Sequence, residues 1–434
     1  MADVSPDSAR LEWRRHWKVV VPCFIGIMLI SLHGHSLGVM IRPLEEEFGW
    51  PRAQISAGFL FISVLALLVG PIVGGFVDRM GPRRIGLYGL LIYCATLSML
   101  SLANSSIWSW WGLWLVLAMG SMTILPVVWI ALLNGYFFTS RGLAMAIALS
   151  GTGMGAAVWP IITNTLVDEF GWRTAYVMLA VVAVAVSFPI AFFLFREAPP
   201  REASVSPSGD RSQGSVQPGA PLADLAIPEA GEQIRSARFI KLAAASIIFA
   251  VASCALTNNI VPVLIGEGLT PGKAAATAGL LGVGSIIGRV VGGYLLDRLD
   301  GNKVAAFSVL LPLIPTTILL STEQSHLWAG IACLVMGFSV GTELDCCAYL
   351  ATRHFGTCNF GRLFGLINGL LLFGAGVAPT TANYVYDVTH TYDLVLVGLI
   401  PLFLITAILF LAMGNYRHLD PVTGRPAPAP VPGA

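Results

Sequence analysis

The chain has 434 residues, of which 56% are hydrophobic and 11% charged, and its formal net charge at pH 7 is +1. An ordinary soluble domain carries about 25% charged residues, so this composition excludes a water-soluble globular protein. The longest polar stretch, residues 196–238, leaves no room for a soluble catalytic domain. We therefore expect a membrane protein that is not an enzyme.

Twelve apolar segments follow one another along the chain, each near the roughly 20 residues that cross a bilayer as a helix. The first is a retained crossing, because its apolar run of about 22 residues exceeds the roughly 7–15 of a signal-peptide core. The sequence thus predicts an all-α membrane protein with twelve transmembrane helices. The predicted crossings are residues 19–40, 55–77, 85–103, 109–135, 142–167, 174–195, 239–266, 273–299, 304–320, 327–352, 363–385 and 394–413.

The polar stretch in the middle of the chain separates six predicted crossings from six. It is rich in Pro, Ser and Gly and has no apolar periodicity, which is typical of a flexible tether. The Pro-rich C-terminal residues indicate disorder. The predicted domains are an N-terminal six-helix bundle (1–195), a cytoplasmic linker (196–238), a C-terminal six-helix bundle (239–414) and a disordered cytoplasmic tail (415–434).

Most of the 25 Lys and Arg residues lie on the side of the predicted membrane that holds the N-terminus. Connections on the cytoplasmic side are the ones enriched in Lys and Arg. We therefore expect a multi-pass protein of the cytoplasmic (inner or plasma) membrane with both termini in the cytoplasm. Because the basic residues follow the topology, no nucleic-acid partner is expected, and no obligate protein partner is evident.

The seven cysteines lie in or at the edges of predicted crossings, without the spacing of a metal site. We interpret them as small packing residues. The chain has no Gly-x-x-x-x-Gly-Lys phosphate-binding loop and no Ser-His-Asp pattern. Neither a cofactor, a metal nor ATP-driven transport is therefore expected.

A short motif occurs once in each half of the chain. Residues 74–79 read GGFVDR and residues 292–298 read GGYLLDR, and each copy closes an apolar stretch of helical length. Two copies about half a chain apart indicate that one membrane unit was duplicated. Transporters are commonly built from such repeats, with the substrate site between them.

Twelve crossings in two halves, with GGFVDRMGPRR at residues 74–84, resemble the major facilitator superfamily. Residues 38–56 and 136–172 are similar to its monocarboxylate porter branch, which includes oxalate–formate-type antiporters. The resemblance implies two pseudo-symmetric bundles that alternately open a central site to either side. It also implies that the repeated motif gates the cytoplasmic side, through Gly74, Asp78, Arg79, Gly81, Arg83, Asp297 and Arg298.

Arg289 is the ionisable residue that most strongly indicates an anionic substrate. It lies about two turns from either polar end of a predicted crossing, where an arginine costs about 2.5–3.5 kcal/mol unless it is compensated. Its planar, permanently charged guanidinium suits a carboxylate. The resemblance places a substrate-binding arginine here, and Ser285 stands where the branch has its acidic partner. A structural ion pair with another helix is the alternative.

Glu343 and Asp345 place two carboxylates inside the apolar run 327–352. They lie about 200° apart around a helix, so only one can face a cavity squarely. We expect the pair to neutralise Arg289 or carry the coupling proton, with Glu343 as first choice for the cavity. His35 aligns with a substrate-facing lysine of some branch members and is a further candidate.

Asn258 and Tyr349 are expected to line the site as well. The predicted function is a secondary active transporter of a small organic anion, most simply a monocarboxylate moved together with a proton across the lipid bilayer. Three alternatives stay open. They are an organic-anion antiporter, an efflux carrier for a larger amphiphile, and a membrane sensor that transports nothing.

Overall fold

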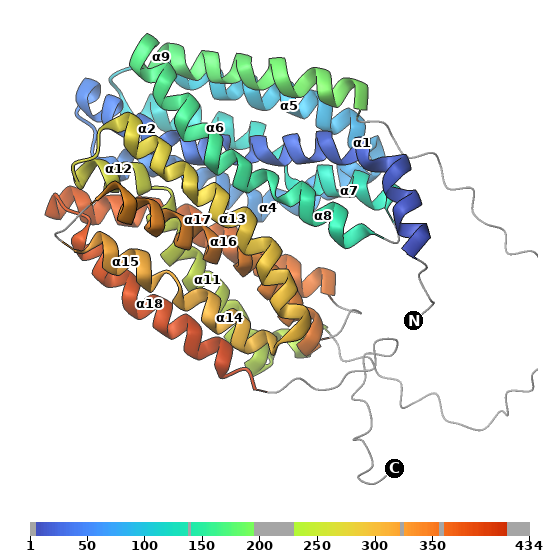
Figure 1. Cartoon of the computed structure of the whole chain (residues 1–434). Coiled ribbons are helices and arrows are strands. Elements are labelled where there is room, and N and C mark those ends of the chain that lie inside the picture. Colours follow the sequence, from blue (N-terminus) through green and yellow to red (C-terminus); the bar gives the residue numbers. More distant parts are fainter. Residues whose placement is uncertain (1–5, 138–139, 195–229, 322–324, 356–359, 415–434) are drawn as a thin grey trace, which may run out of the picture.

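The computed structural model of the chain describes residues 6–137, 140–194, 230–321, 325–355 and 360–414, and these residues are almost entirely helical (Figure 1). The helices of the first half are α1 (Pro6–Ile30), α2 (Leu32–Phe48), α3 (Arg52–Ser56), α4 (Gly58–Met80), α5 (Pro82–Ser98), the short 3-10 helix η1 (Met99–Leu102), α6 (Ile107–Met122), α7 (Pro126–Tyr136), α8 (Arg141–Leu149) and α9 (Gly151–Leu194).

The second half begins with a short helix and continues with longer ones. These are α10 (Ala230–Arg235), α11 (Ala237–Thr257), α12 (Ile260–Gly266), α13 (Pro271–Arg298), α14 (Gly301–Leu310), α15 (Leu313–Leu319), α16 (His326–Phe355), α17 (Phe360–Thr389) and α18 (Asp393–Leu411). Helix α10 lies inside the segment predicted as a linker, whereas residues 196–229 and the predicted tail lie outside the described residues.

Eleven helical segments of the described chain are long and apolar enough to cross a membrane. One of them, Leu143–Leu194, has 52 residues and contains two crossings. Its backbone leaves the helical conformation at Gly171 (φ 75°, ψ 162°), a left-handed geometry that glycine adopts without strain. Figure 1 shows α9 turning back on itself there. The chain therefore has twelve transmembrane helices, and the predicted fold class is confirmed.

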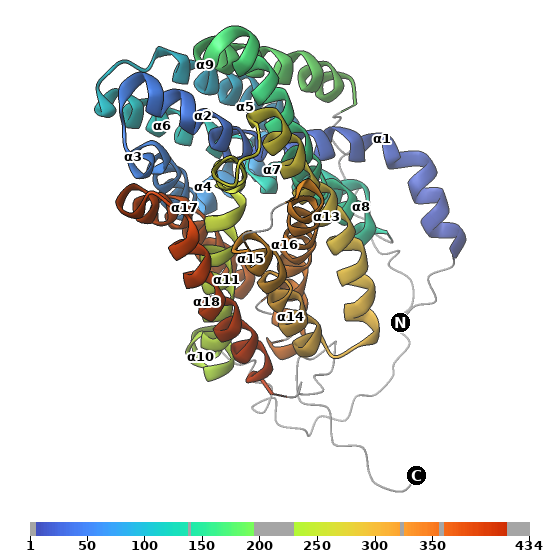
Figure 2. The same cartoon turned by 60° about the vertical axis from the view of Figure 1, so that its left-hand side comes forward.

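Each half of the chain is built around an apolar core. One core contains residues from Val19 to Ala191, and the other contains residues from Phe239 to Met413 together with Val39 of α2. The first core is rich in buried tryptophans, whereas the second is built mainly of Ala, Leu and Val. Figure 2 shows the halves as two bundles, with the blue and green helices on one side and the yellow and red helices on the other.

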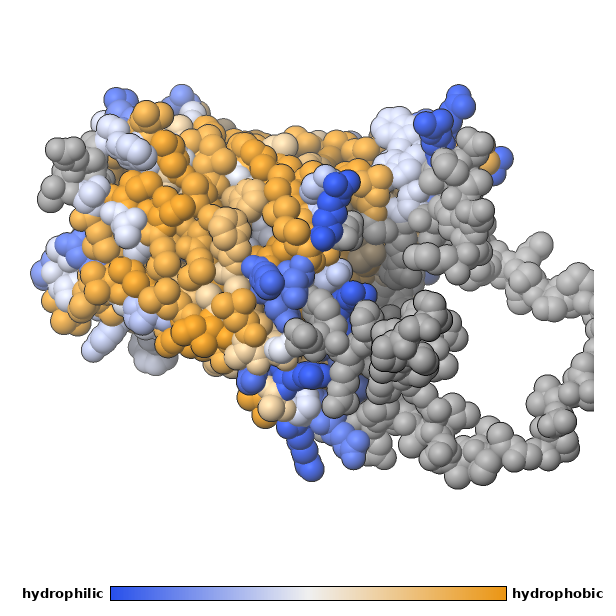
Figure 3. Space-filling view, turned by 60° about the horizontal axis from the view of Figure 1, so that its bottom comes forward, coloured by the Kyte–Doolittle hydropathy of each residue, from blue (hydrophilic) through white to orange (hydrophobic). Residues whose placement is uncertain are grey.

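Apolar side chains cover the outside of the bundles as well. Leu68 and Val290 are 66% and 70% exposed, and many other large apolar side chains share this position. Figure 3 shows a broad apolar surface with hydrophilic residues gathered toward the ends. Such a surface is stable only against lipid, which is as apolar as the side chains themselves.

Candidate functional site

The first crossing of each half is interrupted. In the first half the break falls at Ser31, between α1 and α2, and in the second at Asn258 and Asn259, between α11 and α12. Interrupted helices commonly form transporter sites, because their free backbone groups can face a substrate or an ion. His35 and Asn258, both predicted site residues, lie in or next to these breaks.

Arg289 lies on α13 and faces Asp345 on α16. Its Nη1 atom is 4.0 Å from Oδ1 of Asp345, and the two side chains are 9% and 30% exposed. The same Nη1 atom has no hydrogen-bond partner in the described part of the chain. The arginine thus has a nearby counter-ion but unused donors, so it has capacity for a further acceptor.

Glycines explain how α13 and α16 come close enough for this pair. A Cβ atom added at Gly288 would lie 2.0 Å from the carbonyl oxygen of Phe338, and one added at Gly341 equally close to that of Ser285. The hydroxyl of Thr342 also donates to the carbonyl of Gly288, at 3.0 Å. Small residues let membrane helices pack backbone against backbone. This packing determines which α16 residues face Arg289.

The two α16 carboxylates have different surroundings, and the choice of Glu343 for the cavity stays a prediction. Asp345, rather than Glu343, stands beside Arg289. Glu343 is 8% exposed, and its Oε1 atom has no hydrogen-bond partner among the described residues. The two positions differ by about 200° around the helix. Because α13 packs against the side of α16 that carries Asp345, Glu343 points away from Arg289.

The two histidines of α2 have different surroundings. His33 lies among aromatic rings, and its Nδ1 is 3.1 Å from the hydroxyl of Tyr93. His35 is half-buried one residue after Gly34. Three residues further on, Gly38 lets α2 cross α12, since a Cβ added there would lie 3.0 Å from the carbonyl oxygen of Asn258.

The predicted site residues fall into two groups. Ser285 precedes Arg289 by one turn of α13, and Tyr349 follows Asp345 by one turn of α16, so these four lie on one packed helix pair. Tyr349 is half-buried, with the Arg353 guanidinium 5.7 Å from its ring centroid. His35 and Asn258 form the second group, where α2 crosses α12.

The predicted gating residues are only partly described. Gly74, Asp78 and Arg79 lie in α4 and Asp297 in α13, but their side chains lie outside the described part of the chain. Gly81 has a positive φ of 84° at the turn into α5. Arg83 donates to the carbonyl of Phe192 in its own bundle at 3.3 Å, and the Arg298 guanidinium lies 4.4 Å from the Tyr294 ring centroid.

A set of contacts that the sequence did not predict joins the bundles at the end away from the termini. Asp387 of α17 accepts hydrogen bonds from the backbone amides of Arg52 and Ala53, at 2.9 and 2.8 Å. Arg52 lies 3.8 Å above the Tyr386 ring and is 2.9 Å from Glu45. We call these contacts, from Arg52 and Ala53 to Asp387 and Tyr386, the inter-bundle latch.

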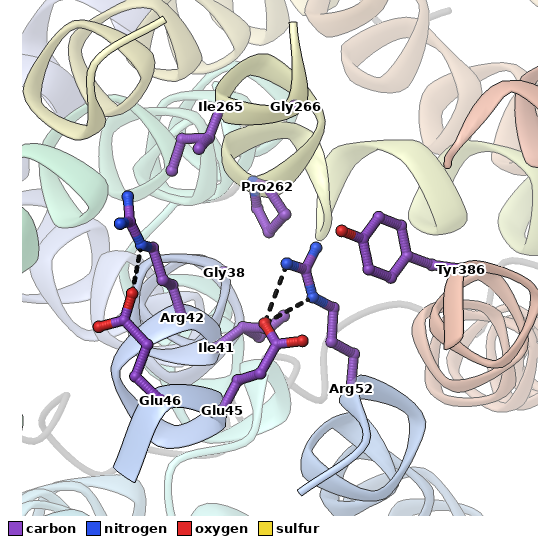
Figure 4. A pocket seen from close by; sticks show the side chains of 10 residues that line it. All are labelled: Gly38, Ile41, Arg42, Glu45, Glu46, Arg52, Pro262, Ile265, Gly266 and Tyr386. Carbon is purple, nitrogen blue, oxygen red and sulfur yellow. Dashed lines mark hydrogen bonds and ion pairs between the residues drawn. The ribbon is translucent and has the colours of Figure 1, made fainter. Parts of the chain in front are cut away.

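Figure 4 shows Arg52 between Glu45 and Tyr386, beside a cavity of about 490 Å³. Arg42 and Glu46, 2.7 Å apart, line the same cavity. A neighbouring cavity of about 400 Å³ shares this pair. Both cavities lie on the latch side of the α2–α12 crossing.

A buried hydrogen-bond network lies next to the latch. Asn383 donates to the Ser56 hydroxyl and to Oδ1 of Asn259, both at 2.9 Å. It also accepts a hydrogen bond from the Tyr392 hydroxyl at 2.8 Å. Burial raises the pKa of Tyr392 to about 12, so this hydroxyl keeps its proton throughout the physiological range.

One local signal in the sequence points to the latch. Helix α3 is preceded by Pro51, which has no side chain that can cap a helix, and no side-chain cap is formed locally. A helix start without Ser, Thr, Asp or Asn leaves its first amides to water or to an acceptor from elsewhere in the chain. The identity of that acceptor, more than 330 residues along the chain, has no signature in the sequence.

The family model described as Major Facilitator Superfamily matches residues 23–379. The uncharacterised MFS-type transporter YcxA of Bacillus subtilis is 24% identical, over 89% of this chain and 92% of the relative. The gallate transporter of Pseudomonas putida is 26% identical (82% and 85% covered), and monocarboxylate transporter 13 of Bos taurus 24% identical (87% and 84% covered).

Solved structures show the same fold at lower identity. A bacterial homologue of the human lysosomal transporter Spinster, in an inward-facing and occupied conformation, aligns with a TM-score of 0.66 at 15% identity, covering 91% of this chain and 96% of that one. A point mutant of the nucleoside transporter NupG aligns with a TM-score of 0.70 at 12% identity, covering 92% and 100%.

Proposed function

Because the chain belongs to the major facilitator superfamily and is a membrane transporter of that type, we propose that it carries a small organic anion together with a proton. Two relatives support the class of substrate, since gallate and monocarboxylates each present a carboxylate. At this low identity the names indicate a chemical class and no particular acid.

The observation that carries the proposal is the incomplete pairing of Arg289. Its Nη1 atom is 4.0 Å from a carboxylate oxygen of Asp345 and makes no hydrogen bond among the described residues. An arginine can hold a carboxylate by two parallel hydrogen bonds. The substrate carboxylate takes the free donors first and then displaces Asp345, which is the more exposed member of the pair.

Proton coupling follows from this exchange. Once the substrate occupies Arg289, Asp345 is a carboxylate without its cation in a largely apolar surrounding, where an isolated charge is costly. Taking up a proton removes that cost and balances the charge of the cargo. Asp345 is thus our choice for the coupling residue, and Glu343 and His35 are the other candidates on α16 and α2.

The latch bears on the conformation within the transport cycle. We propose that both termini are cytoplasmic, which puts the latch on the outer side and makes the described state closed to the outside. Release of the latch and closure at the opposite end would give the outward-facing state. The repeated motif at residues 74–79 and 292–298 is proposed to gate that opposite end.

The test is uptake into proteoliposomes containing the purified full chain, with radiolabelled lactate, gallate and succinate as probes. Arg289→Ala should lower uptake of the preferred acid by roughly 10- to 150-fold, because a hydrogen bond to a charged group is lost. Uptake by Arg289→Lys should lie between that of wild type and that of Arg289→Ala, since lysine keeps the charge without the planar fork. Lys273→Gln, at the exposed start of the same helix, should transport normally.

Wild-type uptake by Arg289→Ala would contradict the anion site. An antiporter is the second candidate. The branch resemblance predicts an acidic residue on α13 that is tied to proton coupling, and this chain has Ser285 at that position. Uptake that dissipates an imposed pH gradient supports symport. Uptake that requires an internal organic acid and ignores pH supports exchange.

A further inference from the structure

The first turns of α1 extend beyond the apolar run that begins at Val19. Residues 10–18 are helical and cover about 12 Å along the helix axis at 1.5 Å per residue. Because α1 continues directly into the first crossing, these turns start at the membrane surface. They therefore lie at the depth of the lipid headgroups.

One side of these turns is bound to the protein. The ring centroids of Trp13 and Phe137 are 5.1 Å apart, as are those of His16 and Tyr136. The carboxylate of Glu12 accepts a hydrogen bond from the backbone amide of Ser140 at 2.8 Å. These contacts fix the rotation of the helix against α7 and the start of α8.

The opposite side is strongly basic and exposed. At 100° per residue its side chains cover one continuous face. Leu11 and Trp17, which belong to this face, are 55% and 50% exposed. The cationic side chains of the face are Arg10, Arg14, Arg15 and Lys18, all exposed. The only acid among residues 10–18, Glu12, is held on the other side.

A bend separates this face from the rest of α1. Pro22 lies inside α1 and has no backbone N–H for the carbonyl four residues earlier, which is a usual cause of a kink. Figures 1 and 2 both show the first turns of α1 at an angle to the rest of the helix. A helix tilted at the membrane surface can insert Trp and Leu while its cations meet headgroups.

We propose that residues 10–18 form a binding surface for the acidic headgroups of membrane phospholipids, with Trp17 and Leu11 inserted beside them. Basic residues at an acidic bilayer surface each strengthen binding about fivefold. Four such cations on one face should therefore enrich acidic lipid at this helix. The surface is independent of the transport site, since it lies on the outside of the first bundle.

The experiment measures which lipid touches Trp17. The full chain is reconstituted in vesicles of equal parts phosphatidylglycerol and phosphatidylcholine, with brominated chains, which quench tryptophan, on one lipid or the other. Trp17 emission is the difference between wild type and Trp17→Phe. We expect brominated phosphatidylglycerol to quench it at least about threefold more than brominated phosphatidylcholine, because the four cations select the acidic headgroup.

Trp108 supplies the matched control. It is 74% exposed at the start of α6, at the opposite end of the bundle, with no cation among residues 104–111. Its emission, obtained with Trp108→Phe, should be quenched equally by both lipids. Changing Arg10, Arg14, Arg15 and Lys18 to Gln should remove the preference at Trp17.

Salt tests the same point without any substitution. Raising it to about 1 M shortens the screening length to about 3 Å, which should also remove the preference. Equal quenching of Trp17 by the two lipids at low salt would overturn the proposal. A preference that survives both high salt and the fourfold Gln variant would overturn it as well.

Discussion

Arg289 is held in an apolar helix by an electrostatic balance that can be estimated. Placing arginine at a helix centre in a membrane costs about 2.5–3.5 kcal/mol. A charge pair at 4.0 Å is worth about 4 kcal/mol at an effective dielectric constant of about 20, and less when one partner is 30% exposed. The two energies are comparable. Asp345 therefore keeps the arginine in place, and under the proposed mechanism a substrate carboxylate with better geometry replaces it.

Replacing Asp345 with Asn should tighten substrate binding, because the cargo no longer competes with a resident carboxylate. A partly exposed ion pair is worth at most about 1 kcal/mol net, so we expect KM to fall by roughly threefold to fivefold. Proton-driven accumulation should also be lost, since the amide cannot take up a proton. Uptake kinetics with and without a pH gradient measure both effects.

Glu343→Gln is the matched control on the same helix, because Glu343 lies away from Arg289. It should leave KM within about twofold of wild type and preserve the response to a pH gradient. If Glu343→Gln abolishes that response and Asp345→Asn does not, Glu343 is the coupling residue and our assignment fails.

At the scale of the helix, α3 depends on the other bundle for its N-terminal cap. It has only five residues and no local capping side chain. Asp387 supplies the acceptor for two of its free amides, and its charge suits the positive end of the helix. The contact thus links the start of α3 to the conformation of the whole carrier.

Asp387→Ala should favour opening at the latch end. Loss of a helix cap costs about 0.5–2 kcal/mol, so the open population should rise by roughly 2- to 30-fold. The measurement is the alkylation rate, by a membrane-impermeant maleimide, of a cysteine introduced at Ile265, which lines both cavities. In the control Asp393→Ala, at the exposed start of α18, the cysteine at position 265 should be alkylated at the same rate as in otherwise wild-type protein. An unchanged rate in Asp387→Ala would show that the latch does not hold this end closed.

On the scale of the molecule, each half has a core built mainly of its own residues, and the halves are joined by packed helices and by polar contacts at one end. The backbones of α9 and α13 approach closely at Gly153 and Gly282, where a Cβ added at Gly282 would lie 2.0 Å from a carbonyl oxygen. Surfaces of this kind allow small rotations between bundles without opening an apolar core. Transport by rocking requires the latch to break once in every cycle.

Cysteines at positions 53 and 387 should therefore stop transport when they are joined. Oxidation of the Ala53→Cys, Asp387→Cys double variant should abolish uptake, and reduction should restore it. Each single variant should be insensitive to the oxidant. The measurement is uptake before oxidation, after oxidation and after reduction. Continued uptake by fully cross-linked protein would exclude opening at this end.

Local sequence was sufficient for the fold and for locating the buried arginine. The crossings follow from apolar runs, and the repeated GGFVDR-type motif indicates the two halves. Arg289 stands out because a charge in an apolar run requires compensation. The bend at Gly171 also falls between two predicted crossings. Glycine suits this bend because it tolerates a positive φ.

Only the tertiary structure decided which groups meet. Periodicity shows that Glu343 and Asp345 point apart, but the contact of Gly288 and Gly341 with the opposite helices determines that Asp345 faces Arg289. The latch joins Arg52 to Asp387 across more than 330 residues. Hydropathy and motif spacing describe each helix by itself, whereas side-chain partners depend on how neighbouring helices rotate and pack. For that reason the sequence determined the membrane architecture and the buried cation, and the packing determined the partner of that cation and the contacts of the latch.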